Sequence, residues 1–410
     1  MLSVWTIIVS FFTLLTSIAV FYIAGVIISY SSKPRPSFDA NLFFPCLIKG
    51  FLFLVSLYAI WITKGKTILL LVPVLLLMVG FLKKPVLIIQ KESENIKFKQ
   101  LILFILTACL LYSVYYSQAF ITNGELVNYA GGDTSFYARA AYNLQLNGIE
   151  NPRIEYLYPQ RFNPEPYHYY DLWFVAGVSK ITGINTHLVY LLIIYPFFAV
   201  VFVTGIWTFL KKYFRNPLFS AIAIFAALFA GIRFFYPYFI LRGAYIFDYT
   251  PSLLIKTTFT GCVIIYSMIT LQKRNWVEFL ITVTLLAVGY VNLAPAFVLS
   301  ISLVLAIGFY RKEITLKSIS GAVILILIQG AYFYYFYKSD DHGNQFSEAI
   351  ESKYFRRSIL VFFEGVLQLF ILLPFFILLM ICSSSGSKAA GISRLICFPS
   401  ISASVYSNIF

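Results

Sequence analysis

Apolar runs of about 20 residues, separated by short polar or basic turns, recur along this chain. A run of that length lets an α-helix cross a bilayer with every backbone polar group satisfied inside the helix. The pattern predicts an all-α polytopic membrane protein with about eleven transmembrane helices. The predicted spans are Val4–Tyr30, Leu42–Ile62, Thr67–Leu82, Leu101–Ile121, Leu188–Leu210, Pro217–Gly231, Pro251–Leu271, Trp276–Val291, Ala294–Tyr310, Lys317–Tyr337 and Ile359–Ile381.

The composition agrees with this pattern and argues against a nucleic-acid-binding protein. The 410-residue chain is 60% hydrophobic and only 12% charged, whereas a soluble protein carries about 25% charged residues. A net charge of +14 would suggest nucleic acid as a partner for a soluble protein. Here the basic residues sit between apolar runs and form no continuous basic face, so we do not expect nucleic-acid binding.

Lysine and arginine mark one side of the membrane. The predicted turns on that side carry basic pairs, and the run Lys91–Lys99 is the strongest basic marker. Because short cytoplasmic turns are enriched in Lys and Arg, we assign these turns to the cytoplasm. The N-terminus and the long polar interval, roughly Ile121 to Tyr170, are then expected outside.

The polar interval holds the first candidate for chemistry, Asp133. The run Ser135–Leu146 predicts a helix that ends at Asn147-Gly148, and Tyr137 lies four residues after Asp133 on the same face. A carboxylate at a helix N-terminus is favoured by the helix dipole, and Asp is also a common N-cap residue. Spacing alone leaves both roles open, a catalytic base and a helix cap.

The second half of the interval is rich in proline and aromatic residues. The motif Pro166–Trp173 leads into Phe174–Ile181, which is too short to span. We predict an amphipathic helix at the membrane interface there, with Tyr and Trp at headgroup depth. His168 is either a structural residue or, with Asp133 and Asp248, part of a metal site, although no ligand spacing supports a metal.

Two stretches resemble a known family. Asp133-x-x-x-Tyr137-Ala138-x-x-Ala141, followed by the Pro166–Trp173 motif, resembles the first extracytoplasmic loop of GT-C superfamily glycosyltransferases, closest to the protein mannosyltransferase and aminoarabinose transferase branch. Asp248–Leu254, with basic residues Lys273 and Arg274 at the far end of the next span, resembles a second acidic motif of that family. The resemblance extends from about Leu101 to Arg274.

The resemblance implies a GT-C-like fold whose outer loop carries interfacial helices, and an enzyme that moves a sugar from a polyprenyl-phosphate donor. The acceptor, a lipid, glycan or protein, would be reached at the outer face, with inversion at the anomeric carbon. Asp133 would be the general base, and Asp248 would assist at the same site. Arginine suits the leaving lipid phosphate because its guanidinium makes forked contacts. The candidate substrate-binding residues are Tyr137, Arg139, His168, Tyr169, Arg233, Arg242 and Lys256. The role of a divalent metal is left open.

The chain departs from the family pattern in three ways. Thr134 replaces the second acid of the first pair, and Glu165-Pro166 stands where two prolines are usual. Three predicted spans, rather than one, precede the motif. We expect N-terminal spans and a basic cytoplasmic loop over residues 1–100, a catalytic membrane domain over 101–382 with its outer loop at 121–187, and a tail over 383–410 that is a marginal helix or the start of an incomplete region. The absence of an Asn-x-Ser/Thr sequon favours a bacterial plasma membrane.

Two other function classes remain. A membrane glycan polymerase or ligase of another family would use basic residues and a large late loop, and Lys338–Arg357 has that character. A lipid or glycan transporter would place ionisable groups near the bilayer midplane. Only Lys49 and Glu364 lie well within predicted spans, which weighs against transport.

The predicted topology can be tested with single cysteines placed beside Asp133, Asp248 and Lys91. We expect a membrane-impermeant thiol reagent, added to intact cells, to label the first two and to label the third only after the membrane is opened. Labelling of the cysteine beside Lys91 in intact cells would contradict the orientation.

Overall fold

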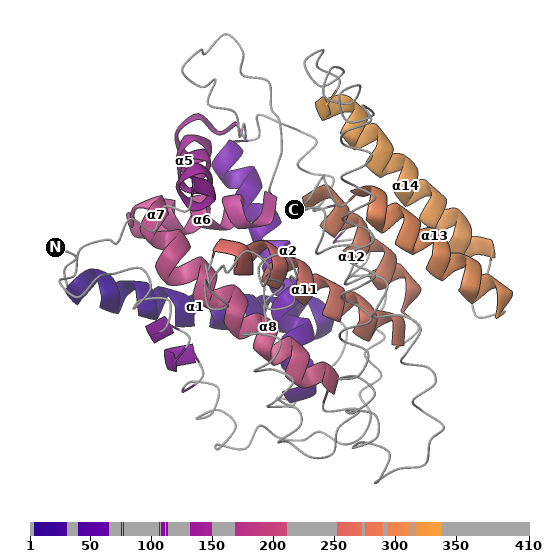
Figure 1. Cartoon of the computed structure of the whole chain (residues 1–410), viewed down its shortest axis with the longest axis horizontal. Helices are drawn as coiled ribbons and strands as arrows, with labels where there is room; N and C mark the ends of the chain where they lie inside the picture. Colours follow the sequence, from indigo (N-terminus) through magenta and orange to yellow (C-terminus); the bar gives the residue numbers. More distant parts are fainter. Residues whose placement is uncertain are drawn as a thin grey trace, which may run out of the picture.

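The computed structural model describes residues 4–30, 40–64, 132–149, 169–210, 252–272, 275–289, 294–311 and 316–337, with isolated positions at 75, 77, 106, 108–110, 112–113 and 314. Every element in these ranges is helical (Figure 1). The helices are α1 (Val4–Tyr30), α2 (Ala40–Thr63), α5 (Gly132–Asn147), α6 (Tyr169–Thr182), α7 (Thr186–Val189), the π-helical η4 (Tyr190–Ile194), α8 (Tyr195–Leu210), α11 (Ser252–Gln272), α12 (Trp276–Gly289), α13 (Ala294–Tyr310) and α14 (Leu316–Tyr337).

Three stretches within the described residues are long and apolar enough to cross a membrane. They are Trp5–Ser29, Phe43–Thr63 and Thr186–Phe209. Together with the nearly all-helical fold, they indicate a membrane-embedded protein. Helices also form where the sequence predicted shorter or later spans, at α11, α12, α13 and α14. Apart from isolated positions, the predicted spans Thr67–Leu82, Leu101–Ile121, Pro217–Gly231 and Ile359–Ile381 lie outside the described residues, so the full count stays a prediction.

Helices α1 and α2 approach each other through glycine. A Cβ added to Gly50 would lie 1.8 Å from the carbonyl oxygen of Phe21, and one added to Gly25 would lie 1.7 Å from that of Cys46. Contact this close between two backbones is possible only without side-chain atoms, as at other small-residue crossings of membrane helices. The pair is therefore held by backbone contact as well as by side-chain contacts such as that of Phe21 with Phe51.

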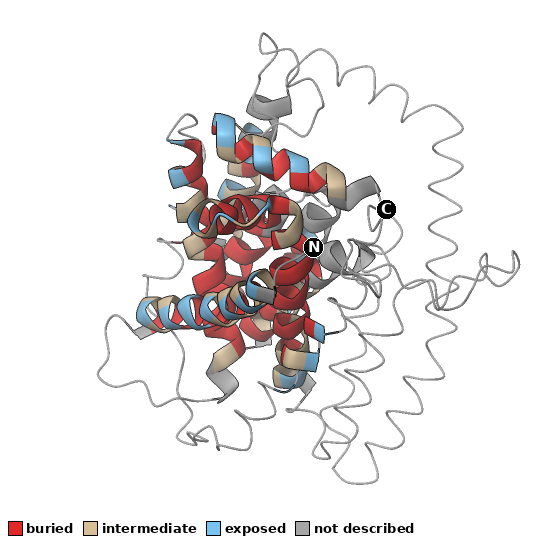
Figure 2. Cartoon of the chain, turned by 90° about the vertical axis from the view of Figure 1, so that its left-hand side faces the viewer, coloured by how far each residue is buried: buried red, intermediate tan, exposed pale blue. Residues whose placement is uncertain are grey.

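An aromatic cluster centred on Phe51 of α2 joins five helices. The Phe51 ring centroid lies 5.3–6.2 Å from those of six aromatic neighbours, which come from α1, α6, α8 and α11. These neighbours are Phe21, Tyr170, Phe174, Phe197, Phe198 and Phe259. Most of these ring pairs are edge-to-face or tilted, the arrangements that aromatic quadrupoles favour. Figure 2 shows buried residues concentrated in this central part of the molecule.

Helix α6 lies inside the bundle. Every residue from Tyr170 to Ser179 is buried, so the prediction of an amphipathic helix with one exposed face is wrong. Its position relative to the membrane interface stays a prediction. Its apolar residues occupy all sides of the helix, which is the pattern of a buried helix rather than of one lying in the interface. Gly183, at φ 72°, ends the helix and donates its N–H to the carbonyl of Ser179.

The stretch that follows α6 contains a short π-helical segment. At its end, the backbone N–H of Tyr195 donates to the carbonyl of Tyr190, five residues back. Pro196 comes next and has no N–H to donate. The α-helical pattern, in which each N–H donates to the carbonyl four residues earlier, is therefore interrupted at this point. The wider turn joins α7 to α8 in one continuous rod, which is the third membrane-crossing stretch.

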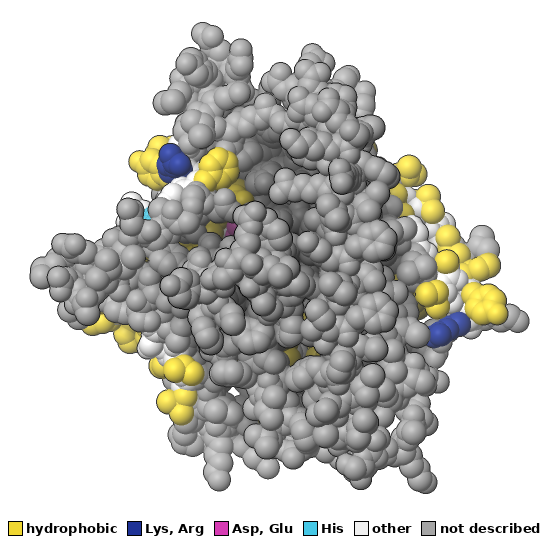
Figure 3. Space-filling model, in the orientation of Figure 1, with side chains coloured by type: hydrophobic (Ala, Val, Ile, Leu, Met, Phe, Trp, Pro, Cys, Tyr) yellow, Lys and Arg dark blue, Asp and Glu magenta, His cyan; other side chains and the backbone are white. Residues whose placement is uncertain are grey.

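The C-terminal helices complete the described part of the bundle. Helix α11 packs on α8 and α12, and α12 packs on α13 and α14, which lie at the right of the molecule in Figure 1. Hydrophobic side chains gather over α13 and α14 on that edge in Figure 3, where Phe309, Ile324 and Leu327 are exposed. An exposed apolar face of this kind suits contact with lipid.

The glycine contact can be tested by Gly50→Ala. We expect this change to cost about 3 kcal/mol or more, because the added methyl meets backbone that cannot move aside. The matched control is Gly321→Ala in α14, where no described atom lies within 4 Å of the added Cβ. That change should leave stability unchanged or raise it by roughly 0.5–1 kcal/mol. Thermal unfolding of the purified protein in detergent measures both, and equal midpoints would contradict the contact.

Candidate functional site

Helix α5 carries the residue predicted to be the catalytic base. Its backbone places Asp133 in the first turn, four residues before Tyr137. Gly148, at φ 67°, ends the helix and donates its N–H to the carbonyl of Leu144 at 2.8 Å. The helix predicted over Ser135–Leu146 and its stop at Asn147-Gly148 are confirmed, whereas the side chain of Asp133 lies outside the described residues.

The other two candidates on α5 lie on different faces. Tyr137 is buried, and its ring packs edge-on against Phe136 with centroids 5.5 Å apart. Arg139 is exposed, and its Nε donates to the carbonyl of Ser135 at 3.3 Å. Two positions along a helix are about 200° apart, so these side chains do not converge. A role for Arg139 in holding phosphate would therefore require a substrate that approaches the exposed face of α5.

The remaining predicted site residues are not brought together by the described part of the chain. His168, Arg233, Arg242 and Asp248 lie outside the described residues. Tyr169 is the first residue of α6, and Lys256 lies in the second turn of α11, but their side chains are likewise outside the described residues. The predicted pairing of Asp133 with Asp248 therefore stays a prediction.

The C-terminal ends of α5, α6 and α2 meet at one corner of the bundle. The Ser179 hydroxyl of α6 donates to Gln145 of α5 at 3.2 Å. A Cβ added to Gly148 would lie 3.1 Å from the carbonyl oxygen of Thr63 at the end of α2. The Lys180 ammonium sits 4.6 Å from the ring centroid of Trp61, a cation–π contact. Helix α5 is thus held against two elements of the core, α6 and α2.

A buried acid that the sequence analysis did not single out lies in the first turn of α6. Asp171 is 2% exposed, and the Tyr190 hydroxyl donates to its Oδ2 at 3.2 Å. Burial raises the pKa of the neighbouring Tyr170 hydroxyl, which therefore stays protonated. Asp171 lies within the Pro166–Trp173 motif, directly after two tyrosines, and that position was the available signal. The bond from Tyr190 ties the start of α6 to η4.

A second buried polar cluster connects α2 to α12. The Lys49 ammonium lies 2.6 Å from Oε1 of Glu278, with both side chains buried. The Tyr266 hydroxyl and the Asn275 side-chain amide also donate to the Glu278 carboxylate. A buried charge pair persists only when further hydrogen bonds satisfy its remaining polar atoms, and here they do so for the carboxylate.

Part of this cluster was visible in the sequence. Asn275 and Glu278 are three residues apart at the start of α12, and the backbone N–H of Glu278 donates to Asn275 Oδ1 at 3.3 Å. This is one half of a capping box, because the Glu278 carboxylate accepts from the side-chain amide of Asn275, whose backbone N–H instead donates to the carbonyl of Thr270 at 3.0 Å. The N-cap half is a local signal. Lys49 lies far away in the sequence, and no local pattern pairs it with Glu278. The N-terminal spans are thereby linked by charge to the C-terminal helices.

Neither a metal cluster nor a relative identifies the site. Within the described ranges, no group of three or more His, Cys, Asp or Glu lies close enough to hold a metal ion. Comparisons of this chain with protein-family models, with curated proteins and with solved structures find no match.

The Lys49–Glu278 pair can be tested by removing one charge at a time. We expect Lys49→Met and Glu278→Gln each to cost about 3–5 kcal/mol, because each leaves a buried charge without its partner. The double variant Lys49→Met/Glu278→Gln should cost much less than the sum of the two single losses, since no unpaired charge remains and the amide oxygen at position 278 can still accept from Tyr266. Chemical unfolding in mixed micelles measures the difference, with Arg311→Gln at an exposed position as the control. Strictly additive losses would show that the two charges do not interact.

Proposed function

We propose that this chain is an integral-membrane glycosyltransferase that uses a polyprenyl-phosphate sugar donor, with Asp133 as its general base. The observation that carries the proposal is the placement of Asp133 in the first turn of a helix that the buried α6 and the end of α2 hold in place. A carboxylate in a first turn is stabilised as the anion by the helix dipole. An ionised carboxylate on a rigid element is what a general base requires.

The proposed step is a single inverting displacement. The oxygen of the acceptor hydroxyl attacks the anomeric carbon of the donor sugar, and a new glycosidic bond forms. The bond between that carbon and the phosphate oxygen breaks, so the lipid phosphate leaves with the electron pair. The acceptor proton passes to the Asp133 carboxylate. Asp248 would orient the acceptor, and Arg233, Arg242 and Lys256 would offset the negative charge on the leaving phosphate.

Transport is the second candidate, and the buried Lys49–Glu278 pair is the observation that favours it. Ionisable residues within membrane helices often mark the path of an ion or substrate. Here, however, the Glu278 carboxylate also accepts hydrogen bonds from Tyr266 and Asn275, so it is held by three donors in all. A group that exchanges protons or ions during transport needs an alternative state, whereas one held this firmly suits a fixed role in packing. We therefore place the transferase first.

The proposal makes Asp133 the decisive residue. We expect Asp133→Asn to lower sugar transfer by about 100-fold or more, since the amide cannot accept the acceptor proton. The comparison variant is Asp341→Asn in the late polar loop, which should keep normal transfer. Transfer of label from a polyprenyl-phosphate sugar in proteoliposomes measures both variants.

The two variants also separate the proposal from its enzymatic rival. A loss confined to Asp341→Asn would favour the membrane polymerase or ligase class, whose chemistry would lie in Lys338–Arg357. Full transfer by Asp133→Asn would rule out the base. Because α5 depends on its buried face, both proteins should first show the same thermal midpoint as the unmodified chain.

A further inference from the structure

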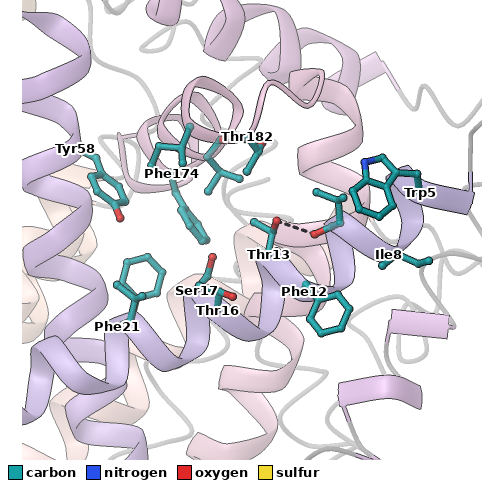
Figure 4. Close-up of a pocket in the computed structure, with 14 residues that line it drawn as sticks. Trp5, Ile8, Phe12, Thr13, Thr16, Ser17, Phe21, Tyr58, Phe174 and Thr182 are labelled. Atoms are coloured by element: carbon teal, nitrogen blue, oxygen red, sulfur yellow. Dashed lines mark hydrogen bonds between the residues drawn. The ribbon is translucent and has the colours of Figure 1, made fainter.

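A groove between α1, α2 and α6 is not used by the proposed chemistry. It encloses about 560 Å³ (Figure 4). Its floor is formed by Phe21, Phe174 and Val178, all buried. Along its rim lie the exposed side chains of Trp5, Phe12 and Ile181. The groove therefore has a buried apolar floor and exposed apolar side chains along its opening.

The groove exists because α1 diverges from the bundle toward its N-terminus. At Gly25 and Phe21 the backbones of α1 and α2 are in contact, and no space remains between them. Further toward the N-terminus, Tyr58 of α2 and the last turns of α6 lie opposite α1, and the slot opens there. The gap follows from the positions of the helices, so a small shift of side chains would not close it.

Two features of the lining identify the chemistry of an occupant. Among the described residues that line the groove, none is charged. Two of its hydroxyls are already engaged with their own helices, since Thr13 donates to the carbonyl of Val9 at 2.7 Å and Thr182 to that of Val178 at 2.8 Å. Thr16, Ser17 and Tyr58 bring the other hydroxyls of the lining, and its remaining side chains are apolar. The described lining thus offers mainly contact to hydrocarbon and holds no cation for a phosphate.

The surroundings identify the source of that hydrocarbon. Helix α1 is long and apolar enough to span the membrane, yet only 28% of its most apolar window is buried. Its exposed apolar face, which includes one rim of the groove, is therefore suited to contact with lipid. A void next to lipid loses packing contacts unless something fills it. Bilayer lipids supply hydrocarbon chains of the kind that such a space accepts.

We propose that this groove holds one hydrocarbon chain of a bilayer phospholipid, which fills the space between α1 and α6 and fastens the first span to the bundle. The site selects for a chain and not for a headgroup, because its described lining carries no charge. This assignment is independent of the proposed transferase activity. The groove is therefore not the binding site of the polyprenyl-phosphate donor, because that site must hold a phosphate.

The proposal can be tested by placing a large side chain in the groove, so that it occupies the space of the lipid chain. Ser17 lines the slot, and Ala19, two residues along α1, is exposed and does not line it. Native mass spectrometry of the full chain, after dilution with detergent, should show a phospholipid retained by the unmodified protein and by Ala19→Phe. Ser17→Phe should lose that lipid. Retention should be equal for phosphatidylcholine and phosphatidylglycerol.

A second variant and a competitor complete the test. Thr16→Phe, at another lining position, should lose the same lipid and covers the case in which Ser17→Phe does not fold. Unchanged retention in the folded variants would overturn the proposal. So would a strong preference for one headgroup, or displacement of the phospholipid by an equimolar polyprenyl phosphate, which would assign the groove to the substrate instead.

Discussion

Three consecutive residues of α2 set the packing of the described bundle. Lys49 pairs with Glu278 of α12, the Gly50 backbone contacts α1, and the Phe51 ring contacts α6, α8 and α11. Because successive residues of a helix point about 100° apart, one turn reaches three different sides. Helix α2 can therefore neither rotate nor slide without breaking a charge pair, a backbone contact and an aromatic cluster together. The positions of α1, α6, α8, α11 and α12 relative to α2 are set by these contacts.

The three contacts also show which forces are available in a membrane. Lipid chains are as apolar as Leu or Phe, so burial from water does not drive one span onto another. The contact at Gly50 instead gains close approach of two backbones, and the rings around Phe51 gain favourable aromatic geometry. The Lys49–Glu278 pair is compensated by the further donors Tyr266 and Asn275. Its main effect is specificity, because a wrong neighbour would leave a buried charge unpaired.

The elements that depend on local pattern were predictable from the sequence. The bounds of α1 and α13 agree with the prediction, and Asn147-Gly148 ends α5 where expected. The burial of α6 was not predictable, because whether its apolar residues meet lipid, headgroups or other helices depends on neighbours distant in the sequence. The same holds for Lys49 and Glu278, whose pairing is a property of the packed bundle. Of the candidate site, the position of Asp133 on its helix was predictable, but its neighbours were not.

The burial of α6 has a consequence for α5 that an interfacial helix would not have. Tyr170 and Phe174 near the start of α6 lie against Phe51, and Lys180 near its end lies against Trp61, so α6 follows α2 outward from the aromatic cluster. Helix α5 is attached to the outer part of this rod through Gln145 and Gly148. Its position is therefore set by the core and not by the fluid headgroup region. Under the proposed function, Asp133 in the first turn of this helix would gain the fixed geometry that proton transfer requires, so the packing around α2 would support the reaction.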